Sequence, residues 1–305
     1  MQPQSPSNIV PDDETLDQLA LVIASKVIAE ASNTGYSETQ HAFLKLDWKY
    51  LPVTPYEFLM SDDYMGKFGA GLYPKWVDEL QYVLDPSNNI TEWILSGAIG
   101  IGKSTIAALA MAYKIYRISC LKNPANFFGL MEESAIVFGI YSLFKYKAQD
   151  DNFGNLKVMI DGCPYFRDVF PRAKMKSKGA ADDLDFPNRI GVLAGSTELH
   201  AIGLNLLGLI CDEVNFMKQA KTDGPVDERV GQAHKLYNAS KRRLESRFAY
   251  RGQVPGLMIM ISSRNSETSW LETHMDEVRD QPSTHISDFP LWEIKPKQNY
   301  TGERF

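Results

Sequence analysis

Cysteine is scarce in this sequence, and its few copies are far apart: Cys120, Cys163 and Cys211 are the three in 305 residues. Their number is odd, and no two have the close spacing of a metal-binding motif. The five histidines are also isolated, and we expect them to be structural or solvent-facing. The sequence therefore predicts neither a disulfide framework nor a cysteine–histidine metal centre, and a reducing cytosol is the compartment that fits best.

Long apolar runs and excess positive charge are lacking as well. The longest runs, at 135–144 and 256–261, are too short to span a bilayer, and the polar, acidic start MQPQSPSNIVPDDE is unlike a signal peptide. A net charge of −6 argues against a chain that coats nucleic acid over its whole surface, although it allows a local basic track. With 44% hydrophobic residues, the chain can bury a large core in one or two domains.

The clearest chemical signal is the stretch EWILSGAIGIGKST at 92–105. It combines a short buried strand at 93–95, a glycine-rich loop and the start of a helix. Gly97, Gly102, Lys103 and Ser104 complete the spacing of a phosphate-binding loop. An ordinary glycine-rich turn is the alternative, but the strand before the loop and the helix after it are the context that the motif requires.

Each residue type in this loop has a chemical reason. Glycines let backbone N–H groups converge on a phosphate chain, and the positive end of the following helix points at the same charge. We expect Lys103 to reach the β- and γ-phosphates and the Ser104 hydroxyl to bind Mg²⁺. The sequence thus predicts ATP and Mg²⁺ as cofactors, with nucleotide contacts from Gly97, Ala98, Ile99, Gly100, Ile101, Gly102, Lys103, Ser104 and Thr105.

The rest of the chain alternates apolar strands with helices. Strands are expected at 93–95, 134–140, 206–211, 256–261 and 285–289, and helices at 13–31, 75–84, 105–120, 143–160, 226–249 and 268–279. A hairpin is expected from 184–186 and 189–194. This order predicts an α/β fold with a mostly parallel central sheet and helices on both faces. Ligands then bind at the carboxyl ends of the strands.

A second motif follows a buried strand, where LLGLIC runs into Asp212 and Glu213. Asp212 would hold Mg²⁺, mostly through water, and Glu213 would polarise the attacking water as general base. A plain polar strand end is the alternative. The intervening strand at 134–140 favours the P-loop NTPases of the additional-strand catalytic-glutamate type, which insert a strand between the two motif strands.

Small hydroxyl residues and arginines complete the candidate site. Ser262 and Ser263 follow the strand GLMIMI, where they could sense the γ-phosphate, or they could cap the next helix. Phosphoryl transfer also favours an arginine near the developing charge. Arg264 is best placed to act within the chain, and Arg247 or Arg243 could act on a neighbouring subunit. Arg242 and Arg251 are further candidates.

Three segments together resemble the large terminase subunit of tailed bacteriophages, the motor that packages DNA into the prohead: WILSGAIGIGKST, LLGLICDEVNFM and GLMIMISSRN. The resemblance covers about 50–305. It implies an ATPase that translocates double-stranded DNA as a ring, usually of five subunits, in the host cytoplasm and without a membrane. Its implied partners are the portal protein and the small terminase subunit.

By motif match, the resemblance carries over four roles. Lys103 and Ser104 bind phosphate and Mg²⁺, Asp212 is the Mg²⁺ partner, Glu213 is the catalytic base, and Ser262–Ser263 is the coupling motif. Two departures stand out. Many terminases have an arginine inside the phosphate loop, where this chain has 98–101 without one. Trp76, in LYPKWVDEL, stands where the family places a glutamine for adenine, which makes Trp76 a candidate adenine contact.

The sequence pattern and the resemblance together predict a division of the chain. We expect an N-terminal helical segment at 1–48 that acts as a lid or docking arm, a P-loop ATPase domain at 49–290, and a linker at 291–305 toward a nuclease domain that this chain does not contain. Nuclease activity is therefore not expected here.

Two other classes of function stay open. A helicase or recombinase-like ATPase would respond to single strands and separate duplexes. A P-loop kinase or nucleotide-gated binding protein would transfer phosphate to a soluble acceptor or show no turnover. Asp212 and Glu213 favour activation of water over both kinase and binding roles.

Overall fold

The structure is a computed structural model, and it describes residues 46–142, 152–173, 183–195, 204–217, 231–249, 254–263 and 269–300. The chain divides into two compact units, Met1–Leu51 and Pro52–Phe305. All the elements below belong to the second unit. The helix expected at 13–31 lies outside the described residues.

The described residues form one seven-stranded sheet in the order β3-β4-β2-β5-β6-β1-β7. Every neighbouring pair is parallel except β3 and β4, which are antiparallel. This arrangement confirms the predicted fold class. The strands are β1 (Glu92–Gly97), β2 (Ile136–Ser142), β3 (Asp183–Phe186), β4 (Ile190–Gly195), β5 (Leu206–Asp212), β6 (Leu257–Ile261) and β7 (Thr284–Phe289).

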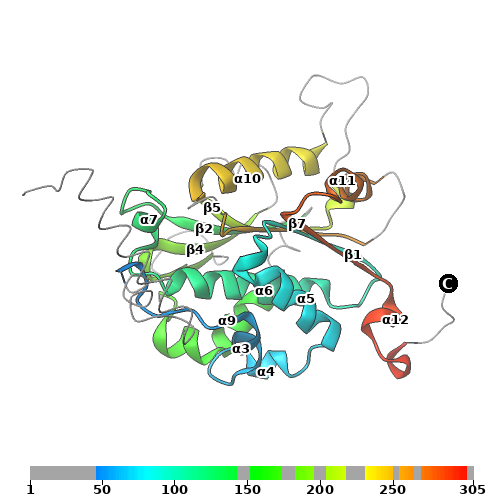
Figure 1. Ribbon diagram of the computed structural model, residues 1–305, viewed down its shortest axis with the longest axis horizontal. Helices are drawn as coiled ribbons and strands as arrows, with labels where there is room; N and C mark the ends of the chain where they lie inside the picture. The colour runs from blue at the N-terminus through cyan, green and yellow to red at the C-terminus, as the bar shows by residue number, and fades with distance from the viewer. Residues whose placement is uncertain are drawn as a thin grey trace, which may run out of the picture. The chain divides into compact units, whose positions relative to one another are not determined.

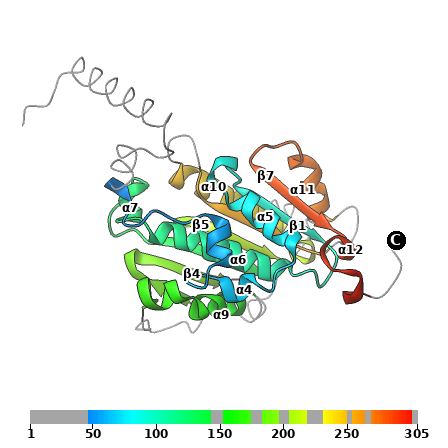
Figure 2. The same cartoon turned by 60° about the horizontal axis from the view of Figure 1, so that its bottom comes forward.

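Helices cover both faces of this sheet, as Figure 1 shows. One face carries α10 (Gln232–Phe248) and α11 (Trp270–Val278). The other face, which comes forward in Figure 2, carries α5 (Pro74–Leu84), α6 (Lys103–Ser119) and α9 (Gly154–Gly162). Because the central strands are covered on both sides, they are apolar along nearly their whole length. No helix in the described ranges is long and apolar enough to cross a membrane.

Short elements connect these layers. The helices are α3 (Pro55–Met60), α4 (Gly66–Gly69), α7 (Pro124–Phe127) and α12 (Leu291–Ile294). Single turns are η1 (Pro86–Asn88), η3 (Tyr165–Val169), η4 (Pro187–Arg189), η6 (Val214–Phe216) and η8 (Lys297–Asn299). In the stretch expected to be a linker, α12 packs against α5.

The strand inserted between the two motif strands is β6. It pairs with β1 on one side and with β5 on the other, so that Leu95 and Asp212 both lie in register with Ile261. The segment at 134–140, which suggested the insertion, instead forms β2 on the far side of β5. Order along a chain does not fix order across a parallel sheet, because each crossover can place the next strand on either side.

The core contains a buried lysine, Lys114, that makes the stability of the domain depend on pH. Lys114, on α6, is 7% exposed, and its Nζ donates a hydrogen bond to the Pro255 carbonyl at 3.0 Å. Burial, with a smaller contribution from the nearby Arg117 charge, lowers the pKa of Lys114 to about 7. The unfolded chain, in which this pKa is near 10.5, therefore binds one more proton than the folded domain between these two values.

Replacing Lys114 with Met is expected to flatten the rise of stability with pH. The contribution of Lys114 to the free energy of unfolding should increase from about pH 7 to about pH 10, because only the unfolded chain binds the extra proton there. Thermal melting across this pH range measures the slope. The control is Lys67→Met, at an exposed lysine on α4. An unchanged slope in Lys114→Met would contradict the assignment.

Candidate nucleotide site

The phosphate loop is built by three glycines with left-handed backbones. Gly97, Gly100 and Gly102 have φ angles of 94°, 79° and 96°, which other residues rarely adopt. The loop leaves β1 at Gly97, and α6 begins at Lys103 directly after it. The backbone thus curves around the start of a long helix, which is the geometry that binds phosphate.

The side chain of Lys103 is buried against this loop and is hydrogen-bonded to its backbone. Its Nζ donates hydrogen bonds to the carbonyl oxygens of Ala98 at 2.8 Å and Gly97 at 3.2 Å, and the residue is 8% exposed. Burial lowers the pKa of Lys103, while the negative charges of Asp212 and Asp288 act in the opposite direction. The two sequence motifs are therefore close enough in space for their charges to interact.

Trp76 supports the loop from α5. Its indole Nε1 donates a hydrogen bond to the Ile101 carbonyl at 2.7 Å, and its ring packs edge-on against Phe289. The residue is only 1% exposed. The adenine contact predicted for Trp76 stays a prediction, and stacking on adenine would require this ring to be uncovered. The hydrogen bond to the loop is a role that sequence reasoning missed.

The segment after β7 also reaches the loop. Ala98 N–H donates to the Phe289 carbonyl at 3.0 Å. Directly after α12, Lys295 Nζ lies 3.8 Å from the point that a Cβ on Gly100 would occupy. Sequence reasoning placed Lys295 in a linker, since a lone lysine after a short helix carries no signal for such proximity.

Asp212 ends β5 with both carboxylate oxygens engaged. Oδ1 accepts the Glu213 N–H at 2.9 Å, and Oδ2 accepts the Asn152 side-chain amide at 2.6 Å. Asn152 is fully buried, and nothing in its sequence context marked it. Two buried oxygens near Asp212, Asn152 Oδ1 and Ser142 Oγ, have no hydrogen-bond partner among the described residues. Ser142 pairs with Asp212 in the sheet register.

These oxygen atoms fit a magnesium site. Mg²⁺ prefers oxygen ligands and keeps several waters, often with one or two carboxylates and substrate phosphates. Asp212 supplies a half-buried carboxylate, and Ser104 supplies a half-buried hydroxyl at the second residue of α6. The described residues contain no cluster of three or more His, Cys, Asp or Glu side chains that could hold a metal alone.

Glu213 has a left-handed backbone, with φ 56° and ψ 38°. For a residue with a side chain this conformation costs roughly 1–2 kcal/mol. The Phe216 N–H donates to the Glu213 carbonyl at 2.9 Å, which closes the short turn η6. Strain of this kind at the end of a strand is common at functional sites.

Ser262 joins the ends of the two motif strands. Its N–H donates to the Leu95 carbonyl of β1 at 3.2 Å, and its Oγ accepts the Asn215 N–H at 3.3 Å. Ser262 is 1% exposed, while Ser263 is half-buried. The structure thus brings the predicted serines between the phosphate loop and the Asp-Glu motif.

The candidate arginines that the structure describes all lie on α10. Arg264 and Arg251 lie outside the described residues. Arg247 is on α10, and one of its guanidinium nitrogens, NH1, lies 3.4 Å from Asn205 Oδ1, just before the start of β5. Because Asp212 ends the same strand, Arg247 is at the opposite end of the sheet from the loop. Arg242 and Arg243 lie earlier on α10.

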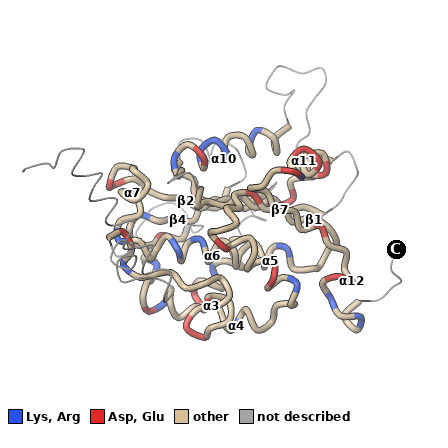
Figure 3. Tube along the Cα trace, in the orientation of Figure 1, with Lys and Arg blue, Asp and Glu red and all other residues tan. Residues whose placement is uncertain are grey.

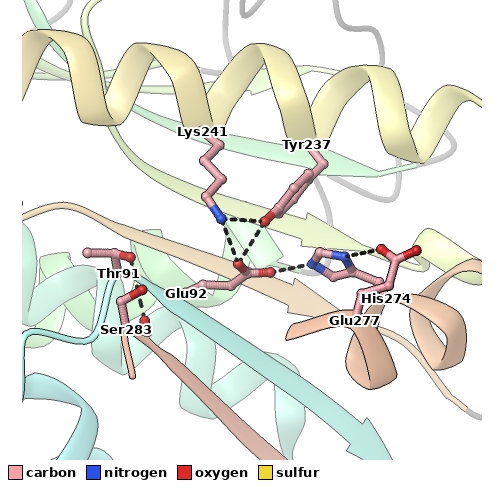
Figure 4. A network of polar contacts seen from close by, with 7 residues as sticks. All are labelled: Thr91, Glu92, Tyr237, Lys241, His274, Glu277 and Ser283. Atoms are coloured by element: carbon pink, nitrogen blue, oxygen red, sulfur yellow. Dashed lines mark hydrogen bonds and ion pairs between the residues drawn. The ribbon is translucent and has the colours of Figure 1, made fainter. Parts of the chain in front are cut away.

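A second polar cluster lies at the amino end of β1, away from the phosphate loop (Figure 4). Glu92 is 3% exposed, and its carboxylate contacts His274 Nε2 at 2.6 Å and the Tyr237 hydroxyl at 2.9 Å. Lys241 Nζ lies 3.7 Å from the same carboxylate. This cluster ties β1 to both helices above it. His274, like His285 beside Glu79, is a structural histidine.

These features define the class of protein. A phosphate loop, a buried lysine beneath it and an acidic pair two strands away make this a P-loop NTPase domain. Residues 52–302 match the family described as "Uncharacterized protein MJ0330, N-terminal P-loop domain", and the chain belongs to that family. No curated protein matches the chain.

Among solved structures, the chain is similar to large terminases. The HK97 bacteriophage large terminase is 16% identical with a TM-score of 0.47, and the match covers 72% of this chain and 39% of that one. Two crystal forms of the large terminase from a thermophilic bacteriophage are 13% and 14% identical, both with a TM-score of 0.46. Each match covers 72% of this chain, and 45% and 44% of the thermophilic phage's chains. The chain thus spans less than half the length of each terminase.

Proposed function

We propose that this domain hydrolyses ATP with Mg²⁺ and uses the energy to move double-stranded DNA, as the motor of a viral packaging terminase. The observation that supports hydrolysis most directly is the position of Glu213. It follows Asp212 at the end of β5, and only β6 separates that strand from the phosphate-loop strand β1.

Each group then has a chemical task. The loop amides and Lys103 bind the phosphates, while Ser104 and Asp212 hold Mg²⁺, which neutralises phosphate charge when bound. Glu213 accepts a proton from the attacking water. Ser262 and Ser263, between the two motif strands, relay the state of the γ-phosphate. A kinase would need an acceptor in place of this water, and the adjacent carboxylates favour water.

The DNA-translocating role rests on the terminase-like motifs and on local charge. In a chain with a net charge of −6, α10 carries five positive side chains and one acidic one (Figure 3): Lys235, Lys241, Arg242, Arg243 and Arg247, with Glu245. Backbone affinity grows with the number of basic contacts, so a ring of subunits would bind duplex more strongly than one subunit. The portal protein, the small terminase subunit, a ring of five and the host cytoplasm belong to the same proposal.

ATP hydrolysis measured without DNA, with duplex and with single strands tests this function. We expect duplex to stimulate turnover more than single strands, and we expect the stimulation to fall with added salt because phosphate contacts release counterions. Arg242→Ala should lower the ratio of the rates with and without duplex, whereas Lys67→Ala, on α4, should not.

Three results would contradict the proposal. Stimulation by single strands together with strand separation would favour the helicase or recombinase-like alternative. Phosphate transfer to a soluble acceptor would favour a kinase. ATP binding without turnover would favour a nucleotide-gated binding protein.

A further inference from the structure

Asn215 lies two residues after Glu213 and uses all its polar side-chain groups. It is 3% exposed, and its own N–H donates to Ser262 Oγ at 3.3 Å. Its side-chain Nδ2 donates to the Ser263 carbonyl at 3.2 Å and to Glu272 Oε2 at 2.9 Å. Its Oδ1 accepts the Leu271 N–H at 2.9 Å. One side chain therefore joins η6, the segment after β6 and the start of α11.

Glu272 fixes the orientation of this amide. The carboxylate is 9% exposed, and its other oxygen, Oε1, has no hydrogen-bond partner among the described residues. A buried carboxylate needs donors, so the Asn215 amide must turn its NH₂ toward Glu272 and its oxygen toward the Leu271 N–H. Hydrogen bonds to charged groups are among the stronger ones in proteins. The Asn215–Glu272 contact therefore allows only one orientation of the Asn215 side-chain amide.

The contacts of Asn215 also constrain the backbone of Glu213, two residues earlier. The left-handed turn at Glu213 is held on one side by Asp212 Oδ1, and Asn215 holds its other side. Catalysis is sensitive to placement, since a misplacement of about 1 Å can cost on the order of 10²-fold in rate. The contacts of Asp212 and Asn215 therefore fix the backbone on both sides of Glu213.

We propose that Asn215 and Glu272 form a positioning pair that directs the Glu213 carboxylate and makes hydrolysis depend on the position of α11. The pair acts through Glu213 and does not itself touch the reacting atoms, and it rests on the proposed hydrolysis by Glu213. The helix is anchored again further along, where His274 contacts Glu92 (Figure 4).

Exchanging the two groups tests the pair. Asn215→Asp places two carboxylates against each other and removes the hydrogen bond from the Asn215 amide to Glu272. Glu272→Gln keeps an acceptor oxygen for the Asn215 amide. The double variant restores an amide–carboxylate hydrogen bond with the roles exchanged, and its aspartate still accepts the Leu271 N–H, but it loses the donor to the Ser263 carbonyl. All three variants are compared with the wild type in kcat, in binding of a non-hydrolysable ATP analogue and in melting temperature.

We expect Asn215→Asp to lower kcat by about tenfold or more, as misplacement of a catalytic group does, with analogue affinity changed by less than about threefold. Glu272→Gln, which keeps an acceptor for the Asn215 amide but loses the charge, should lower kcat less than Asn215→Asp does. The double variant should recover part of the lost kcat, because the contact with the Ser263 carbonyl is not restored. Tyr113→Phe, on α6, is the control: it removes the hydrogen bond from a buried hydroxyl to the Val53 carbonyl, and it should lower the melting temperature without lowering kcat.

The possible results distinguish failure of the positioning pair from failure of the proposed hydrolysis. A wild-type rate for Asn215→Asp, a double variant as slow as Asn215→Asp, or a loss confined to analogue affinity would each overturn the pair while leaving ATP hydrolysis in place. A wild-type protein that binds the analogue but does not hydrolyse ATP would overturn the proposed function, and the pair with it.

Discussion

Replacing Glu213 with Gln is expected to lower ATP turnover by about 10²–10⁴-fold, the usual contribution of general-base catalysis. The amide keeps the size of the side chain and its place after Asp212, but it cannot accept the proton of the attacking water. ATP binding should persist, because the phosphate loop and Lys103 are untouched. The measurement is steady-state release of phosphate together with binding of ATP to the variant.

The matched control for this prediction is Glu245→Gln, at an exposed glutamate of α10. It removes the same charge from the chain and should leave turnover unchanged. Wild-type turnover in Glu213→Gln would show that Glu213 is not the general base. The kinase and the nucleotide-gated binding protein would then be the favoured alternatives.

Gly97→Ala should destabilise the domain and abolish nucleotide binding. A Cβ at this position would collide with the Phe289 carbonyl oxygen and lie 2.7 Å from the Phe289 nitrogen, both backbone atoms of β7. The φ of 94° adds strain of its own. Either β7 must separate from β1 or the loop must move. We expect a loss of about 3 kcal/mol or more, in the range of severe core substitutions.

Gly129→Ala separates the two causes. Gly129 also has a positive φ, 68°, but a Cβ there would meet no atom within 4 Å. It should therefore cost only about 1 kcal/mol from backbone strain. Chemical unfolding of both variants, with ATP-analogue binding measured alongside, compares them. Equal losses at the two glycines would show that β7 yields to the added methyl group.

The sequence predicted those parts of the site that are local in the chain. The spacing of Gly97, Gly102 and Lys103 is set by the loop itself, and the apolar runs ending at Asp212 and Ser262 fix which residues stand at strand ends. Since parallel strands end on one edge, these groups had to meet once the strands paired. The predicted hairpin also formed, as β3 and β4.

Features that depend on distant pairing could not be predicted in this way. Asn152 reaches Asp212 across 60 positions, and Asn215 reaches Glu272 across 57. Glu92 has the sequence context of an ordinary polar strand start, yet it is buried beneath two helices. No local pattern distinguishes such polar residues from solvated ones, because their partners are decided by tertiary packing. For the same reason, the sequence did not show that β6, and not β2, lies between the motif strands.

The position of β7 determines how this domain would transmit tension. β7 is an edge strand, and its partner along all six residue pairs, from Thr284 to Phe289, is the phosphate-loop strand β1. A pull applied at the carboxyl end of β7 would act along these parallel strands. Hydrogen bonds loaded in shear share the force, whereas bonds that are peeled apart break one at a time. The bond between Ala98 and Phe289 lies at the loaded end, so the nucleotide loop would be the first catalytic element to experience the pull.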